Sequence, residues 1–270
     1  MQYILIILLI ILILAILYVL STVCRKGHPG LEALRGWAYA HRGLHDDARP
    51  ENSMSAFRAA LQKGYGIELD IHLLADGELA VIHDSLLKRT TGAEGRIEDL
   101  TAQQLSSYYL EGTLETIPTF KQVLELYDGK APLIVELKPV DGNHAKLCQA
   151  ACDLLDSYQG VYCLESFDPQ CIRWLCKNRP ELIRGQLSEN FFKSGHLNWL
   201  LSLIATALMA NFLTRPDFVA YKYADRHLLP NVLVKKLWGV QQVTWTLKTP
   251  REYANAVKEG YIPIFEDFTP

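Results

Sequence analysis

Polar side chains that can bind a metal ion or move a proton follow several apolar runs between residues 40 and 138. They lie in five short fragments: AHRG (40–43), PENS (50–53), ELD (68–70), IHD (82–84) and VELK (135–138). Charged groups are costly in a strand core, but they are tolerated at the open end of a barrel, where they face a ligand. Two imidazoles, several carboxylates and two cations suit metal-assisted hydrolysis of a phosphate ester.

Three of the carboxylates are placed so that they can converge. Glu68 and Asp70 are two positions apart in one apolar run, and Glu136 ends another run, with Lys138 on its face. Residues two apart in a β-strand point to the same side. Three carboxylates without sulfur ligands form a hard-oxygen site, typical of Mg²⁺ or Ca²⁺ rather than Zn²⁺. We therefore predict a divalent cation on Glu68, Asp70 and Glu136.

Apolar runs alternate with amphipathic stretches along the chain, which favours an α/β fold of parallel β/α units. Residues 25–270 suit a single barrel of about 250 residues. Amphipathic stretches begin at helix-start signals such as Ser53 and Thr119. The sequence thus predicts a (β/α)8 TIM barrel. The eight expected strands are 37–41, 66–71, 133–137, 161–167, 183–187, 218–221, 242–247 and 262–266.

One further strand-like run does not fit this alternation. Residues 79–82 follow residues 71–74 after only Ala75-Asp76-Gly77-Glu78. A four-residue connection with Asp-Gly makes a hairpin, since parallel strands need a longer crossover. We expect a small hairpin insertion after the second barrel strand. It would fold His83 back beside Glu68 and Asp70.

The N-terminus carries an apolar run, residues 3–20, without a charged side chain. It can span a bilayer as a helix at about 1.5 Å per residue. A signal peptide would begin with basic residues, but only Met1 and Gln2 precede the run. Arg25, Lys26 and Arg35 follow it. The positive-inside rule then predicts a single-pass membrane protein with residues 1–24 as a transmembrane anchor and residues 25–270 in the cytoplasm.

A second apolar stretch, residues 197–213, is interrupted by Asn198, Ser202, Thr206 and Asn211. These polar side chains make it a poor membrane span. The favoured interpretation is a buried helix of the barrel. The alternative is a lipid-facing helix near the mouth of the active site.

Composition excludes other classes of protein. The net charge of −3 provides no basic field for nucleic acid, so no nucleic-acid partner is expected. The six cysteines lack a paired CxxC pattern and fall mostly in helix-like segments. We interpret them as free, buried thiols.

The fragments HRG, PEN, ELDIHLLADGELAVIHD and VELK, in this order and spacing, resemble the glycerophosphodiester phosphodiesterase family of the bacterial, membrane-anchored type. The later segments ESFDP (165–169), TWTL (244–247) and IFEDFTP (264–270) resemble it as well. The resemblance extends over residues 37–270. The fold of the family is a (β/α)8 barrel with a hairpin insertion, in agreement with the strands expected here.

The resemblance implies roles for the residues that form the centre of the site. His41 and His83 would be the acid–base pair. Glu68, Asp70 and Glu136 would ligate the divalent cation, Mg²⁺ or Ca²⁺.

It also implies a substrate-binding set around this centre. Arg42 and Lys138 would contact the phosphate, and Glu51 would lie near the metal and the glycerol. Phe167 and Trp245 would form walls of the pocket.

Two segments depart from the pattern of the family. Glu266 and Asp267 stand where the family more often has a Thr-Asp pair. The loop between HRG and PEN is acidic, with Asp46 and Asp47. Both departures bear on which alcohol is accepted, and neither touches the central set.

The leading hypothesis is a metal-dependent hydrolase that cleaves glycerophosphodiesters to glycerol 3-phosphate and an alcohol, with His41 and His83 as acid and base. The nucleophile is either water or the neighbouring glycerol hydroxyl. One alternative is a lysophospholipase-D-like hydrolase acting on lipids of the bilayer that holds the anchor. Another is a membrane-anchored barrel that only binds phosphodiesters, and the intact histidines and carboxylates disfavour it.

Overall fold

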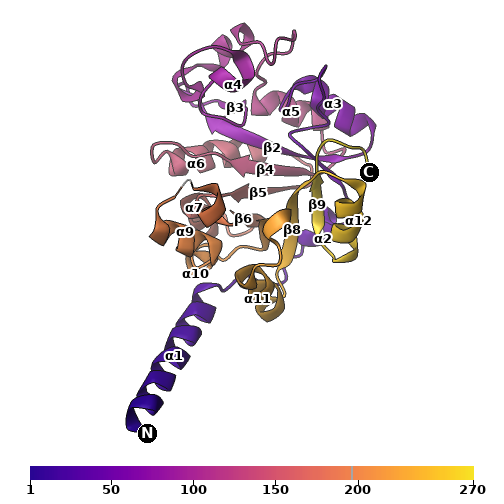
Figure 1. The fold of residues 1–270 in the computed structure, drawn as a ribbon. Helices are drawn as coiled ribbons and strands as arrows, with labels where there is room; N and C mark the ends of the chain where they lie inside the picture. The colour runs from indigo at the N-terminus through magenta and orange to yellow at the C-terminus, as the bar shows by residue number, and fades with distance from the viewer. Residues whose placement is uncertain (196) are drawn as a thin grey trace.

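The strands close into a barrel. The computed structural model describes residues 1–195 and 197–270. In these residues one sheet has the strand order β1-β9-β8-β7-β6-β5-β4-β2-β3, and β1 also pairs with β2, which closes the sheet. All neighbouring strands are parallel except β2 and β3. The eight parallel strands of the described chain confirm the predicted (β/α)8 TIM barrel (Figure 1).

Each expected strand forms, with ends shifted by one or two residues where they differ. The bounds are β1 Tyr39–His41, β2 Gly66–Leu73, β3 Leu79–Val81, β4 Leu133–Leu137, β5 Tyr162–Ser166, β6 Arg184–Ser188, β7 Phe218–Lys222, β8 Gln241–Leu247 and β9 Ile262–Phe265.

The longer helices around the barrel are α3 Met54–Gln62, α5 Phe120–Tyr127, α6 His144–Leu155, α7 Pro169–Asn178, α11 Leu229–Trp238 and α12 Pro250–Lys258. Four of them, α3, α5, α7 and α12, begin at a capping side chain that accepts a hydrogen bond from a backbone N–H of the first turn. Ser53 accepts from Ala56, and Thr119 accepts from Gln122. Shorter helical turns are α2 Leu31–Leu34, α4 Lys88–Thr91, α8 Phe191–Ser194, α9 Trp199–Thr206, α10 Asn211–Thr214, η1 Ile97–Asp99, η2 Ala102–Ser107 and η3 Tyr223–Asp225.

The inner face of the barrel changes from apolar to charged along each strand. Tyr39, Ile134 and Cys163 belong to an apolar cluster that fills the lower part of the barrel. Two residues further on, each of these strands carries His41, Glu136 or Glu165. Because side chains alternate along a strand, the charged groups lie directly above the apolar layer. The apolar floor therefore sets the level at which the polar groups meet.

The hairpin predicted after the second barrel strand is present. β2 and β3 pair antiparallel, with His72 opposite Ala80 and Leu73 opposite Leu79. The chain then forms α4, η1 and η2 around a small apolar core of its own, which includes Ile82, Leu87 and Ile97. This compact insertion lies above β3 in Figure 1. The sequence predicted the hairpin but not the insertion that follows it.

The N-terminal helix α1, Gln2–Ser21, extends away from the barrel (Figure 1). It is long and apolar enough to cross a membrane, and none of its residues is buried. Its C-terminal end is fixed to the barrel. Trp238 Nε1 donates a hydrogen bond to Thr22 Oγ1 over 3.1 Å, the guanidinium of Arg25 pairs with Asp217, and Cys24 is buried. All six cysteines are free thiols in the described part of the chain.

The expectation of a buried helix over residues 197–213 is wrong. The stretch divides into α9 and α10, and α9 exposes Trp199, Leu200 and Leu203. Its buried residues are the polar Ser202 and Thr206. The prediction failed because it assumed that the apolar side chains face the barrel, whereas the hydroxyl groups do so.

Candidate active site

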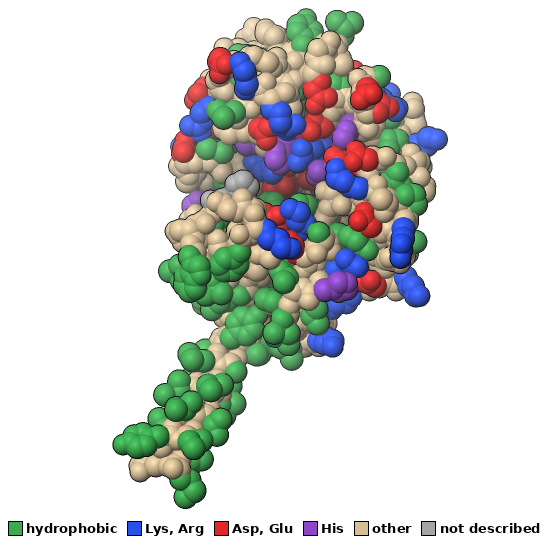
Figure 2. Space-filling view, viewed as in Figure 1, with side chains coloured by type: hydrophobic (Ala, Val, Ile, Leu, Met, Phe, Trp, Pro, Cys, Tyr) green, Lys and Arg blue, Asp and Glu red, His purple; other side chains and the backbone are tan. Residues whose placement is uncertain are grey.

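The carboxyl ends of β1, β2, β4 and β5 bring charged side chains to one level at the mouth of the barrel. His41 pairs in register with Glu68, Asp70 pairs with Glu136, and Glu136 pairs with Glu165. Acidic, basic and histidine side chains gather in the hollow near the centre of Figure 2. The carboxyl ends of barrel strands are where the active sites of such barrels lie.

Glu68, Asp70 and Glu136 form a tight, buried cluster. One carboxylate oxygen from each lies within 4.8 Å of the others. Burial and the neighbouring Asp70 and Glu136 raise the pKa of Glu68 well above its usual value. Burial also raises the pKa of Glu136 to about 7. The cluster therefore holds carboxylates whose negative charges are poorly compensated.

The donor set fits a hard divalent cation. All three side chains offer oxygen atoms, which Mg²⁺ and Ca²⁺ prefer. Asp70 Oδ1 is buried and receives no hydrogen bond from the described residues, although Lys138 Nζ lies 3.2 Å away. Such an oxygen atom can serve as a ligand to a cation. Glu68, Asp70 and Glu136, which the sequence predicted as ligands, could thus hold a metal ion.

Lys138 and Arg42 supply positive charge from two sides. Lys138 Nζ lies 2.8 Å from Glu136 Oε1, and Arg42 Nε lies 3.4 Å from Asp70 Oδ2. Although Asp70 is buried, Lys138 and Arg42 hold its pKa well below the usual range. The backbone N–H of Arg42 also donates to Glu68 Oε2 over 3.2 Å. Both cations face the cluster, as a phosphate-binding role requires.

Arg42 links Glu51 to the carboxylate cluster, because its guanidinium contacts both Glu51 and Asp70. Glu51 Oε1 accepts from Arg42 Nη1 over 3.0 Å and from Arg89 Nη2 over 2.7 Å. Two guanidinium groups thus hold Glu51. Arg89 comes from α4 of the insertion, and no sequence motif pointed to it.

The two predicted histidines lie at the same cavity. His41, His83, Glu68 and Glu136 all line a cavity of about 50 Å³. Burial lowers the pKa of both His41 and His83. Burial thus favours the neutral form of both imidazoles.

Different carboxylates orient the two imidazole rings. His83 Nδ1 lies 2.6 Å from Asp84 Oδ1. His41 Nδ1 lies 3.4 Å from Glu266 Oε1, and its Nε2 lies 3.8 Å from Glu68 Oε2. Carboxylates at these positions favour the protonated form of each ring, in opposition to burial.

His72 holds His83 in place and is itself buried. Its Nε2 lies 3.1 Å from the backbone carbonyl oxygen of His83, and its Nδ1 lies 2.7 Å from Glu98 Oε1. Both ring nitrogens are thus engaged by protein groups. His72 is a positioning residue for the segment that carries His83.

Phe167 and Trp245 form an aromatic wall, as the resemblance implies. Their rings meet edge to face with centroids 5.6 Å apart, and Trp245 Nε1 donates to the carbonyl of Ala220 over 3.2 Å. Phe167 also lines a wider cavity of about 700 Å³ together with His83 and Lys138. This wall bounds the cavities that contain the charged groups.

Sequence reasoning missed three residues of the site. Glu165 is buried, none of the residues that the structure describes donates a hydrogen bond to its Oε2, and burial raises its pKa well above the usual value. Asn52 Nδ2 donates to Asp70 Oδ2 over 2.9 Å. Glu266 was expected not to touch the central set; that expectation is wrong, because its Oε1 lies 3.4 Å from His41 Nδ1. Glu165 could have been found, because it lies near the end of an expected strand, and it pairs in register with Glu136.

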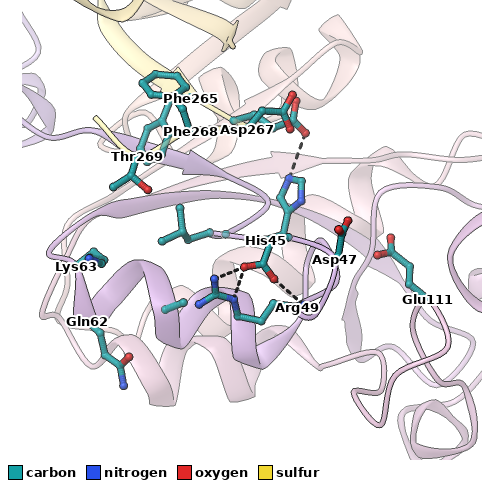
Figure 3. Close-up of a pocket in the computed structure, with 15 residues that line it drawn as sticks. His45, Asp47, Arg49, Gln62, Lys63, Glu111, Phe265, Asp267, Phe268 and Thr269 are labelled. Atoms are coloured by element: carbon teal, nitrogen blue, oxygen red, sulfur yellow. Dashed lines mark hydrogen bonds and ion pairs between the residues drawn. The ribbon is translucent and has the colours of Figure 1, made fainter. Parts of the chain in front are cut away.

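A further cavity of about 860 Å³ lies beside the cluster (Figure 3). It is bounded by the loop after β1, by α3 and by the C-terminal segment, and its lining includes His45, Asp47 and Glu111. His45 points toward the C-terminal segment, where its Nε2 lies 3.1 Å from Glu266 Oε1. Both departures from the family pattern, Asp46-Asp47 and Glu266-Asp267, line this one cavity.

Comparison with known proteins gives a family for this chain. The model of the Glycerophosphoryl diester phosphodiesterase family matches residues 41–269. A glycerophosphodiester phosphodiesterase of Caldanaerobacter subterraneus is 29% identical over 244 residues, covering 84% of this chain and 92% of that protein. Glycerophosphodiester phosphodiesterase 1 of Bos taurus is 28% identical over 278 residues, covering 86% of this chain and 80% of that protein. A match to a Bacillus altitudinis glycerophosphodiester phosphodiesterase, 42% identical over 107 residues, covers 43% of that protein.

Solved structures share the fold. An Oleispira antarctica phosphodiesterase, solved in complex with the product sn-glycerol-3-phosphate, superposes with a TM-score of 0.72 at 21% identity, covering 89% of this chain and 95% of that one. A glycerophosphodiester phosphodiesterase of Thermotoga maritima gives a TM-score of 0.65 at 24% identity, covering 84% of this chain and 93% of that one.

The carboxylate cluster predicts that Glu68→Gln affects thermal stability differently in the absence and in the presence of a divalent cation. In Glu68→Gln, the repulsion from Asp70 and Glu136 is relieved, so the metal-free protein should unfold at the same temperature or higher. The stabilisation by Mg²⁺ or Ca²⁺, about 2.7 kcal/mol at 100 times Kd, should be lost. Thermal unfolding with and without each ion measures both effects.

Glu125→Gln, on the exposed face of α5, is the matched control. It should retain the full stabilisation by metal. If Glu68→Gln retained it as well, Glu68 would not be a ligand.

Proposed function

Because the chain belongs to the glycerophosphodiester phosphodiesterase family and is an enzyme of that family, we propose that it cleaves glycerophosphodiesters to glycerol 3-phosphate and an alcohol. The observation that carries this proposal is the shared cavity. His41 and His83 line it together with the ligand candidates Glu68 and Glu136. Acid–base groups and a metal site thus face the same small space.

The charged residues of the site would bind the anionic substrate. Arg42 lies near one carboxylate oxygen of Asp70 and Lys138 near the other, so a phosphodiester placed over the cluster would meet both cations. A divalent cation on Glu68, Asp70 and Glu136, Mg²⁺ or Ca²⁺ by the donor set, would neutralise the phosphate and polarise its P–O bond. Phe167 and Trp245 would cover the bound ester and exclude water from one side.

His41 and His83 would transfer the protons. The neutral imidazole of one takes a proton from the nucleophile, which is water or the adjacent glycerol hydroxyl. The other donates a proton to the departing alkoxide when the P–O bond breaks. Burial favours the neutral form of both rings in the free protein, and a bound phosphodiester anion raises the pKa of a nearby ring. Substrate binding thereby favours the protonated acid.

Residues 1–24 would anchor the enzyme in the membrane. α1 exposes apolar side chains on all sides, as a helix surrounded by lipid does. Arg25, Lys26 and Arg35 follow it, and by the positive-inside rule these basic residues favour the cytoplasmic side for the barrel domain, residues 25–270.

A lysophospholipase-D-like activity is the second candidate, and one cavity favours it. This cavity of about 460 Å³ lies between the N-terminal end of α7 and α9, and Leu201, Ile204 and Leu208 are among its largely apolar lining residues. Phe167 and Leu187 line both this cavity and the small cavity at the histidines. A hydrocarbon chain could therefore lie in the apolar cavity while the phosphodiester occupies the charged one.

The histidine assignment predicts large losses of turnover. His41→Ala and His83→Ala should each lower kcat for glycerophosphocholine by about 10²-fold or more, because each removes a positioned acid or base. His227→Ala, at an exposed position, is the control and should retain kcat. Release of glycerol 3-phosphate by the full chain with Mg²⁺ or Ca²⁺ measures this. A wild-type chain that binds glycerophosphocholine without cleaving it would contradict the proposed function.

The contact between Glu266 and His41 predicts a shift of the pH profile. Burial lowers the pKa of His41, and the Glu266 carboxylate opposes this effect. In Glu266→Gln the pKa of His41 should fall further, so the limb of the kcat/KM profile that belongs to His41 should move to lower pH. A shift of the acidic limb would identify His41 as the base, and a shift of the alkaline limb as the acid.

The matched control for this shift is Asp267→Asn. Asp267 pairs with Lys248 at 3.0 Å and is not among the groups that shift the pKa of His41. Its pH profile should coincide with that of the wild type. Equal shifts in both variants would show that the Glu266 carboxylate has no specific effect on the pKa of His41.

The apolar cavity predicts a preference for substrates with a chain. The full chain should cleave soluble 1-hexanoyl-lysophosphatidylcholine with a kcat/KM about 10-fold or more above that for glycerophosphocholine, since each buried methylene contributes about 0.8 kcal/mol. Ala205→Phe should fill the cavity and abolish this preference while glycerophosphocholine turnover is retained. The control is Ala254→Phe on exposed α12. Equal kcat/KM for both substrates in the wild type would exclude the second candidate.

A further inference from the structure

Helix α9 exposes apolar side chains and buries polar ones, the reverse of a helix on a water-facing surface. Trp199 is 69% exposed, Leu200 57% and Leu203 37%, while Ser202 and Thr206 are buried. A helix on a water-facing surface normally turns its apolar side chains inward and its polar ones outward. The outward side of α9 is thus matched to an apolar environment.

Hydrogen bonds fix the helix in this orientation. Ser202 Oγ donates to the carbonyl of Leu197 over 3.2 Å, and Thr206 Oγ1 accepts from the backbone N–H of Phe191 over 3.0 Å. Ser188 Oγ at the end of β6 donates to the carbonyl of Ala205 over 2.9 Å. Rotating α9 to bury its leucines would break these contacts. The exposure of the apolar side chains is therefore built into the packing.

The apolar face continues beyond α9. Phe192 of α8 is 50% exposed, and Phe212 and Leu213 of α10 are 48% and 40% exposed. Figure 2 shows apolar side chains gathered over α9 and α10, on the side of the barrel from which α1 extends. We call this surface, formed by the exposed apolar side chains of α8, α9 and α10, the α9 face.

The α9 face adjoins the end of the N-terminal helix. Tyr18, in the last turn of α1, has its hydroxyl 3.4 Å from the carbonyl of Ala207, the residue that directly follows α9. Buried Cys24 packs in one cluster with Leu208. The end of α1 and the α9 face are thus fixed to each other.

We propose that the α9 face lies in the interface of the bilayer that α1 crosses, as a second membrane contact of the barrel. This inference rests on the proposed anchoring by α1. Where α1 leaves the bilayer, the α9 face is the adjoining surface, and a short helix with Trp and Leu on its outer side is typical of an interfacial segment. The contact is continuous with α1, which favours lipid over a second copy of the chain as the occupant.

The contact has a consequence for the active site. α8 and α9 follow β6, so they lie toward the mouth of the barrel, and the apolar cavity that includes Leu201 and Ile204 is directly behind the α9 face. The bilayer interface would therefore lie beside the cavity that shares Phe167 with the charged site. A single-chain lipid could move from the membrane to the site without crossing bulk water.

Quenching of tryptophan fluorescence by brominated lipid tests this placement. The full chain is reconstituted into phosphatidylcholine vesicles whose acyl chains are either brominated or unmodified. Bromine quenches tryptophans that lie in the bilayer, so the wild type should be quenched. Trp199→Phe should lose a clear part of that quenching. Trp174→Phe is the matched control, because Trp174 packs against the barrel core, and it should be quenched like the wild type.

The possible outcomes distinguish the membrane contact of the α9 face from the membrane anchoring by α1. Equal quenching of Trp199→Phe and the wild type, in protein that floats with the vesicles, would overturn the α9 contact and leave the anchor intact. Protein that does not float with the vesicles would overturn the anchor, and the α9 contact with it. Crosslinking of two chains through α9, with no quenching of Trp199, would assign the face to a second copy and overturn the proposal.

Discussion

The mouth of the barrel buries three carboxylates so close together that their negative charges must be offset by positive charge nearby. Glu68, Asp70 and Glu136 cannot move apart, because each is fixed to a strand by the parallel register. Lys138 and Arg42 compensate Asp70, yet the pKa values of Glu68 and Glu136 stay raised. A buried, uncompensated carboxylate is costly. A divalent cation on the three carboxylates would offset these charges, and a phosphate could then bind between Arg42 and Lys138.

Much of this site could be predicted from the sequence because it depends on local rules. The period of two along a strand places Glu68 and Asp70 on one face, and a short Asp-Gly turn folds His83 back toward them. Parallel strands bring their carboxyl ends to one edge, which adds Glu136 from a distant segment. These rules concern strand ends and tight turns, where geometry leaves few choices.

The remaining features depend on contacts between distant segments. Glu266 lies far from His41 in the sequence, and only closure of the barrel between β1 and β9 brings them together. Asn52 reaches Asp70 through the conformation of a loop. For α9, the sequence pattern was clear but its orientation was not, because which side of an amphipathic helix faces inward depends on its surroundings. The apolar side chains that α9 turns outward, Trp199, Leu200 and Leu203, suit the apolar surroundings proposed for it.

The most direct test of the metal site is anomalous diffraction from crystals of the full chain grown with Mn²⁺, which takes the same oxygen ligands as Mg²⁺. We expect one strong anomalous peak bound by oxygens of Glu68, Asp70 and Glu136, next to His41 and His83. A peak elsewhere, such as among the acidic side chains of the cavity in Figure 3, with none at these three carboxylates, would contradict it.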